Sequence, residues 1–173
     1  FSVDTHPADH LIAQFKAGGF PSCVYDLDLM AETRVYTEIE DIVFDRIAEN
    51  PATCGIKVES VQLEGSALKV KVSMKSSTGG DYDLACAVLR DGLEYQGGYS
   101  DNDDGIYNHV VVAASESFIA YYDGQEVAAG AEISEEFSFD FGDDVPSAAV
   151  LKDYYVAVYA HRKQSSLKPV RPL

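Results

Sequence analysis

The stretch Ala67–Lys75, ALKVKVSMK, decides the fold because its apolar and polar side chains alternate without interruption. Every second position is apolar, namely Leu68, Val70, Val72 and Met74, and the position after each of them is polar, namely Lys69, Lys71, Ser73 and Lys75. Successive side chains of a β-strand point to opposite faces of its sheet. The segment therefore predicts a strand with one buried face and one solvated face.

The same period of two recurs on both sides of this segment, over 55–64, 81–89, 106–114, 132–141 and 154–161. In the segment 132–141 it predicts that four apolar side chains point inward, namely Ile133, Phe137, Phe139 and Phe141. The segments between these strands are rich in Gly, Asn, Asp and Ser, which favour turns. About six half-buried strands at this spacing predict an antiparallel β-sandwich over residues 53–165.

Residues 1–52 have a different pattern, which predicts the order helix, strand, helix. HPADHLIAQFKAGG begins at residue 6 with a plausible N-cap at Thr5 and ends at Gly18 and Gly19. EIEDIVFDRIAENP repeats apolar residues at helical spacing and is closed by Asn50 and Pro51. The fold class is therefore α+β, with a basic, Pro-containing surface tail at 166–173.

The composition limits the classes of partner. The net charge is −16, from 29 acidic and 13 basic residues, so the chain repels nucleic-acid phosphates and anionic membrane surfaces. No apolar run reaches the roughly 18–20 residues needed for a transmembrane helix. The chain begins with Phe1 and shows no leader, so we expect a processed product or a fragment.

The three cysteines do not form a recognisable site. Cys23, Cys54 and Cys86 are about 30 residues apart, and no C-x-x-C pair occurs. Cys86 lies within a strand-like apolar run, which favours a small core residue.

The acidic loop before residue 105 raises the question of calcium. Placing Gly105 at the sixth position of an EF-hand loop puts Ser100 at the first position and Val111 at the twelfth, so both end ligands fail. Looser cation binding by Asp101, Asp103 and Asp104 remains as an alternative to a solvated turn, and calcium is the only cofactor that we consider.

Histidines offer two further candidates. His6, Asp9 and His10 place two imidazoles four residues apart, but Pro7 stands where a zinc protease needs Glu. His109 lies in a strand-like segment without a serine or cysteine nucleophile motif, so a structural role is favoured. We nominate no catalytic, cofactor-binding or metal-ligating residue.

Several short motifs resemble those of a known group of proteins. GGFPSCVYD is similar to the fourth-strand region of a thioredoxin-like domain, and YTEIEDIVFDRIAEN is similar to the terminal helix of that fold. Together with the later strands and YNHVVVAAS, the order resembles a group of Bacteroidetes outer-membrane-associated proteins, in which a thioredoxin-like domain precedes an immunoglobulin-like β-sandwich.

The resemblance implies roles for particular residues. Pro21 would be the cis-proline of the thioredoxin-like part, and Tyr107, Asn108, His109 and Val110 would form the motif of the sandwich. The arginine that follows the histidine in the group is absent here. The first strands of the thioredoxin-like domain, with any C-x-x-C motif, would lie before Phe1.

These expectations lead to two functional hypotheses. The first is a non-catalytic module of an exported, lipid-anchored protein at the outer membrane or cell surface of a Gram-negative bacterium, which binds a protein or glycan partner. The alternative is a thiol-redox envelope protein whose catalytic cysteines lie upstream of Phe1.

Overall fold

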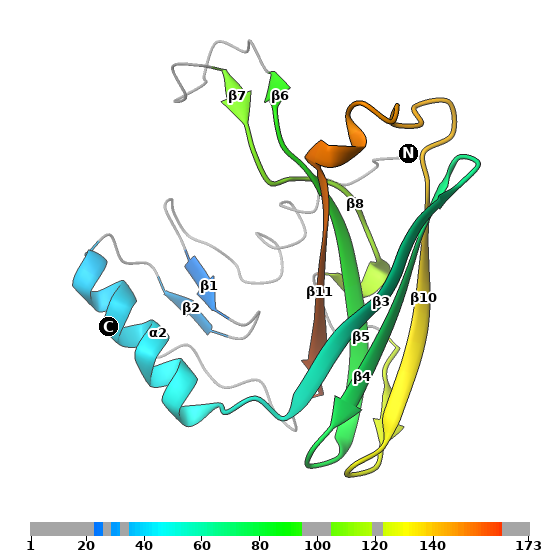
Figure 1. Cartoon of the computed structure of the whole chain (residues 1–173). Coiled ribbons are helices and arrows are strands. Elements are labelled where there is room, and N and C mark those ends of the chain that lie inside the picture. The colour runs from blue at the N-terminus through cyan, green and yellow to red at the C-terminus, as the bar shows by residue number, and fades with distance from the viewer. Residues whose placement is uncertain (1–22, 26–28, 32–34, 95–104, 119–122, 164–173) are drawn as a thin grey trace. The chain divides into compact units, whose positions relative to one another are not determined.

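The computed structural model describes residues 23–25, 29–31, 35–94, 105–118 and 123–163 (Figure 1). The contacts of the chain divide it into two compact units. One unit is Cys54–Arg162, which we call the two-sheet unit, and the other contains the described residues before Cys54.

The N-terminal unit contains two short strands and one helix. Strands β1 (Cys23–Tyr25) and β2 (Leu29–Ala31) pair antiparallel, whereas the sequence predicted a single strand here. A three-residue strand is too short to show the alternation by which the sequence identifies strands. Helix α2 (Tyr36–Glu49) confirms the second predicted helix, and Asn50 ends it by donating its backbone N–H to the carbonyl of Arg46.

The two-sheet unit is built from antiparallel strands. One sheet has the order β10-β4-β3, and the other has the order β11-β5-β8, with β9 also paired to β5. A separate short pair joins β6 and β7. The bounds are β3 (Cys54–Glu64), β4 (Ala67–Ser76), β5 (Gly80–Arg90), β6 (Leu93–Glu94), β7 (Ile106–Tyr107), β8 (Val110–Ala114), β9 (Gln125–Val127), β10 (Glu132–Asp140) and β11 (Tyr154–Arg162), with 3₁₀ turns η1 (Glu116–Phe118) and η2 (Leu151–Asp153).

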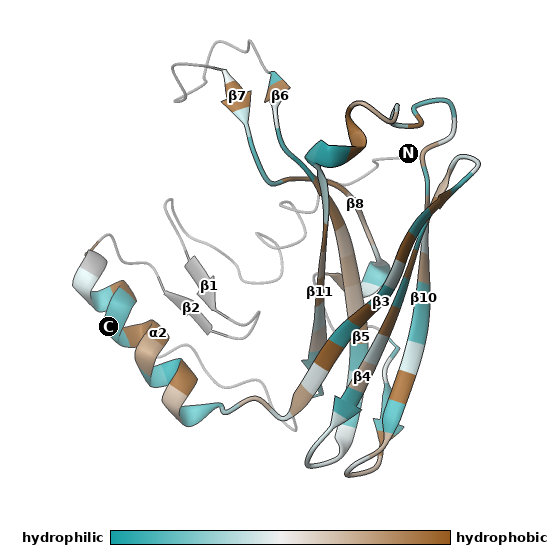
Figure 2. Cartoon of the chain, viewed as in Figure 1, coloured by the Kyte–Doolittle hydropathy of each residue, from teal (hydrophilic) through white to brown (hydrophobic). Residues whose placement is uncertain are grey.

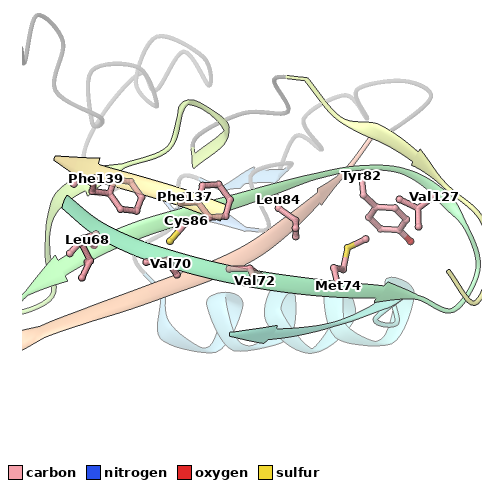
Figure 3. Close-up of a cluster of buried hydrophobic side chains, with 12 residues drawn as sticks. Leu68, Val70, Val72, Met74, Tyr82, Leu84, Cys86, Val127, Phe137 and Phe139 are labelled. Carbon is pink, nitrogen blue, oxygen red and sulfur yellow. The ribbon is translucent and has the colours of Figure 1, made fainter. Parts of the chain in front are cut away.

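The core lies between the facing strands of the two sheets (Figure 3). The predicted apolar face of β4 is buried, as are the two phenylalanines Phe137 and Phe139 of β10. Strand β5 supplies the opposite side with Tyr82, Leu84, Cys86 and Val88. Burial of Cys86 confirms its predicted place in the core.

Strand β5 is buried on both faces, over seven consecutive residues from Tyr82 to Val88. One of its edges pairs with β11 along nine residue pairs. The other edge pairs with β9 only at 80–82 and with β8 only at 87–90. Backbone groups of residues 83–86 on this second edge therefore need other partners, because a buried amide without a hydrogen bond is costly.

Two serines close this gap between β8 and β9. Ser115 accepts a hydrogen bond from the Cys86 N–H through its hydroxyl (3.0 Å) and donates its own N–H to the Cys86 carbonyl (2.8 Å). Ser117 donates its hydroxyl to the Leu84 carbonyl (2.6 Å). The two hydroxyls lie 2.9 Å apart. The segment around η1 thus acts as a substitute strand built from side chains.

The same segment contacts the outer face of the β5–β11 sheet. His161 donates a ring N–H from Nε2 to the Ser117 carbonyl (2.7 Å), and Phe118 packs against Tyr159 with ring centroids 5.6 Å apart. Asp83 is opposite His161 in the strand register and accepts the backbone N–H of Asp123. These contacts explain why β5 has no solvated face.

The described part of the chain is thus mostly antiparallel sheet with one α-helix, which confirms a β-rich α+β class. None of the described helices is long and apolar enough to span a membrane.

Ser117→Ala should lower the free energy of unfolding by about 1–3 kcal/mol, because it leaves the Leu84 carbonyl buried without its hydroxyl donor. Urea denaturation of the purified chain measures this change. Ser134→Ala, at an exposed position of β10, is the matched control and should change the unfolding free energy by less than about 0.5 kcal/mol. Equal effects of the two substitutions would contradict the proposal that the Ser117 hydroxyl takes the place of a strand partner for β5.

Candidate functional site

Strand β3 is the least buried long strand of the two-sheet unit. None of its eleven residues is fully buried. It lies at the end of its sheet, and among the described residues β4 is the only strand that pairs with it. Within the described ranges, its second edge therefore presents a row of backbone N–H and C=O groups without a strand partner, which is a template for pairing with another strand.

A bulge gathers apolar side chains on one face of β3. Ile56 and Val58 are opposite Met74 and Val72 of β4, and after the irregularity at Glu59 the register resumes with Val61 opposite Val70 and Leu63 opposite Leu68. Without the extra residue, Val58 and Val61 would point to opposite faces. We call Ile56, Val58, Val61 and Leu63 the β3 apolar stripe, and its apolar bands are visible along β3 (Figure 2).

The stripe is open to solvent although it lies on the core-facing side of its sheet. Ile56, Val58 and Val61 are 37%, 41% and 47% exposed, whereas the β4 residues opposite them are buried. Exposed apolar side chains that are contiguous and continuous with a free sheet edge are typical of an interaction surface.

The other face of β3 is polar, and hydrogen bonds between its side chains hold the bulge in place. Lys57 donates to Glu59 (2.6 Å), and Glu59 also accepts the hydroxyl hydrogen of Ser73 (2.7 Å). The hydrogen bond from Lys57 lowers the pKa of Glu59, and the same contact raises the pKa of Lys57. These contacts fix the extra residue on the solvated face and leave the stripe uninterrupted.

Strand β10, at the opposite edge of the same sheet, carries a charge that protects it from pairing with another chain. Glu135 is opposite Val72, so it shares the core-facing side with Phe137 and Phe139. Burial, and to a lesser extent the charge of Asp83, raises the pKa of Glu135. An inward-pointing charge on an edge strand discourages pairing with another chain. Strand β3 has no such charge on its core-facing side.

The predicted motif Tyr107, Asn108, His109 forms a corner rather than a continuous strand. The sequence placed His109 inside a strand, but β7 ends at Tyr107, β8 begins at Val110, and His109 has a left-handed backbone with φ of 56°. Asn and His are among the residues that tolerate this conformation best, which is why the strand breaks here.

The turn after β5 clamps this corner. Asp91 accepts the backbone N–H of His109 (2.7 Å) and hydrogen-bonds to the hydroxyl of Tyr155, a contact that raises the pKa of Tyr155. Asn108 accepts the N–H of Gly92 (3.0 Å) through its side-chain oxygen. The His109 ring is 72% exposed and lies near Tyr155, with 5.9 Å between ring centroids. The backbone and Asn108 hold the corner, and the imidazole remains largely in solvent.

The other reactive side chains of the two-sheet unit are held in structural contacts. Burial raises the pKa of Cys86 to about 12 and also raises the pKa of Cys54, where the charge of Arg162 acts in the opposite direction. Burial lowers the pKa of His161, which donates to a backbone carbonyl. At neutral pH these groups are two thiols and a neutral imidazole.

Several residues named from the sequence lie outside the described residues, namely Pro21, the acidic loop residues Asp101, Asp103 and Asp104, and the triplet His6, Asp9 and His10. Within the described ranges, no group of three or more His, Cys, Asp or Glu side chains could hold a metal ion. The proposals for calcium and for the cis-proline therefore stay predictions.

Sequence reasoning predicted the strand at 55–64 but missed the surface on it. The spacing of Ile56, Val58, Val61 and Leu63 changes from two to three at Glu59, and this change of phase inside a strand is the signal of a bulge.

His109→Val should unfold more readily than His109→Gly by about 1–2 kcal/mol, because a β-branched side chain is strained in the left-handed conformation and glycine is not. Urea denaturation of both variants measures the difference. Equal stability of the Val and Gly variants would show that φ at this corner is not fixed.

Glu135→Gln should raise the unfolding midpoint at pH 7 more than at pH 4. The folded state raises the pKa of this carboxyl, so its contribution to stability is complete below the unfolded pKa and is lost as the pH rises through the folded pKa. Glu136→Gln, on the exposed face beside Lys69, is the matched control for the change in net charge. The same gain in both variants would refute the inward placement of Glu135.

Comparisons with known proteins identify a fold neighbour. No protein-family model matches the sequence, and a search of curated proteins gives no match. Among solved structures, the chain is similar to HBP35 of Porphyromonas gingivalis, a Bacteroidetes protein, with a TM-score of 0.66 at 14% sequence identity. A β-glucosidase from Kluyveromyces marxianus in complex with glucose aligns with a TM-score of only 0.34 at 8% identity, over 65% of this chain and 14% of that chain, and carries no argument.

The alignment with HBP35 covers 93% of this chain and 52% of that chain, so this chain spans about half the length of its structural neighbour. At this identity the likeness concerns the fold, and the chain shares its fold with part of HBP35 of Porphyromonas gingivalis.

Proposed function

We propose that this chain is a non-catalytic binding module of an exported cell-envelope protein, and that it binds a partner protein by strand addition at β3. The observation that carries the proposal is the edge of β3 that pairs with no other described strand, beside the exposed β3 apolar stripe. An extended segment of a partner would gain main-chain hydrogen bonds from the edge and specificity from alternate side chains that contact the stripe.

The chemistry of the surface favours a protein over a glycan. A sheet edge offers alternating N–H and C=O groups at the spacing of another strand, and the stripe offers branched aliphatic side chains. Sugar rings bind best on flat aromatic faces, and β3 carries no aromatic residue.

The location and the finer fold assignments are part of the proposal. The fold likeness to a Bacteroidetes protein fits a cell-envelope location. A position at the outer membrane or cell surface and a lipid anchor upstream are further parts of the proposal. We also propose that the two-sheet unit is an immunoglobulin-like sandwich and that the N-terminal unit is the end of a thioredoxin-like domain. Fractionation of the native bacterium, with the full-length protein detected by antibody, tests the location.

The thiol-redox alternative depends on cysteines upstream of Phe1 and remains a prediction. The two described thiols do not favour it, because burial raises the pKa of both and a redox-active cysteine needs a lowered pKa.

A synthetic peptide with the sequence of residues 55–64, GIKVESVQLE, provides a probe for strand addition because it has the alternation of an edge strand and lacks cysteine. We expect the labelled peptide to bind the intact chain, as measured by fluorescence anisotropy. Val61→Ser in the protein should weaken binding about tenfold or more, because it removes an apolar contact of the stripe.

Gln62→Ser is the matched control, since it changes the neighbouring exposed residue on the opposite face of β3. It should bind the peptide within about threefold of the unmodified chain. Failure of the unmodified chain to bind, or equal losses in the two variants, would overturn strand addition at this edge.

A further inference from the structure

We propose that the strand added to β3 is β3 of a second copy of this chain, so that the module forms a two-fold symmetric dimer with one continuous sheet across the interface. The inference rests on the proposed function and names its partner. The argument comes from self-complementarity of residues 55–64 in antiparallel register.

The apolar residues match when Ser60 of one copy lies opposite Ser60 of the other, on the two-fold axis, and Glu59 of each copy is left unpaired. The faces of β3 are set by its pairing with β4, in which Ile56, Val58, Val61 and Leu63 share one face. In this register Val58 is opposite Val61 of the second copy, and Ile56 is opposite Leu63 of the second copy. Symmetry repeats both pairs, so all four members of the stripe gain an apolar cross-strand neighbour.

The charged residues match in the same register. Lys57 and Glu64 share the other, polar face, and Lys57 is opposite Gln62 of the second copy. Glu64 of the second copy is then the diagonal neighbour of Lys57, within reach of a long side chain. The Lys57 side chain is 71% exposed, and its ammonium group, which donates to Glu59, has further N–H donors for Glu64 of the second copy. Symmetry gives two such Lys–Glu pairs.

The bulge fits between the two copies. Glu59 is the extra residue of β3 in its pairing with β4, and its carboxylate is held on the polar face by Lys57 and Ser73. On each side of the axis, Val58 and Ser60 of one copy oppose Val61 and Ser60 of the other, with Glu59 as the unpaired residue. The two bulges are therefore related by the same symmetry and do not interrupt the apolar pairs.

The other edge of this sheet does not offer the same match. A β10–β10 pairing would bring together the acidic residues of that strand, including the half-buried Glu135 on its core-facing side. Like charges placed opposite each other across strands are destabilising. The local pairing at β3 is the favourable one, although the net charge of −16 per chain opposes association at low salt.

Exchange of the two charges tests the register in the intact chain. Sedimentation equilibrium at about 0.15 M salt, over about 1 µM to 1 mM protein, should show a monomer–dimer equilibrium. Lys57→Glu and Glu64→Lys should each raise the dimer dissociation constant about tenfold, because each places like charges at both symmetric pairs. The double variant Lys57→Glu with Glu64→Lys should return it to within about threefold of the unmodified value.

Glu64→Lys separates the local pairing from the overall charge. It makes the chain less negative, so net repulsion alone would strengthen the dimer, whereas the proposed register weakens it. A chain that stays monomeric up to about 1 mM, or a Glu64→Lys variant that dimerises as tightly as the unmodified chain, overturns this inference.

The outcome for the dimer is distinguishable from the outcome for strand addition. Binding of the 55–64 peptide by a chain that stays monomeric would leave the proposed function standing and reject the second copy as the partner. Restored dimerisation in the double variant cannot arise from misfolding, so it would support the register directly.

Discussion

The hydrogen-bonding requirement of β5 is the constraint on which the two-sheet unit depends. Seven consecutive buried residues leave no water to satisfy this strand, so every backbone group must find a partner in the protein. Strand β11 satisfies one edge, and β8, β9 and two serine hydroxyls share the other. The position of η1, the half-buried state of His161 and the covering of the outer face all follow from this one requirement.

The opposite sheet meets a looser requirement, and the proposed interaction surface lies on it for that reason. Strand β4 is central and its apolar face is buried, but among the strands that the structure describes β3 and β10 each pair along one edge only. The two edges differ in chemistry on the core-facing side, since β10 carries Glu135 and β3 carries only apolar residues from Ile56 to Leu63. A single sheet thus has one edge that discourages pairing and one that favours it.

The sequence predicted most of the strands because their alternation is a local property. The buried faces of β4 and β10, the core position of Cys86 and the end of α2 at Asn50 all follow from side-chain spacing and are confirmed. The corner at His109 and the bulge at Glu59 were missed, since each changes the backbone at one residue while the pattern around it still resembles a strand. The contacts of Ser115 and Ser117 with β5 join residues about 30 positions apart, which no local pattern can show.

Glu135 has a consequence for the behaviour of the protein in an acidifying environment. Protonation of this carboxyl removes the charge that discourages other chains from pairing with β10. Because the pKa of Glu135 is raised, this charge is lost earlier, as the pH falls, than the charges of ordinary surface carboxylates. The sequence isoelectric point is about 4.4, so the long-range repulsion between molecules also weakens as the pH falls toward that value. Protonation of Glu135 therefore removes an unfavourable buried charge from the fold and, at the same time, a protective charge from the β10 edge. At this one residue, folding stability and protection against association change in opposite directions.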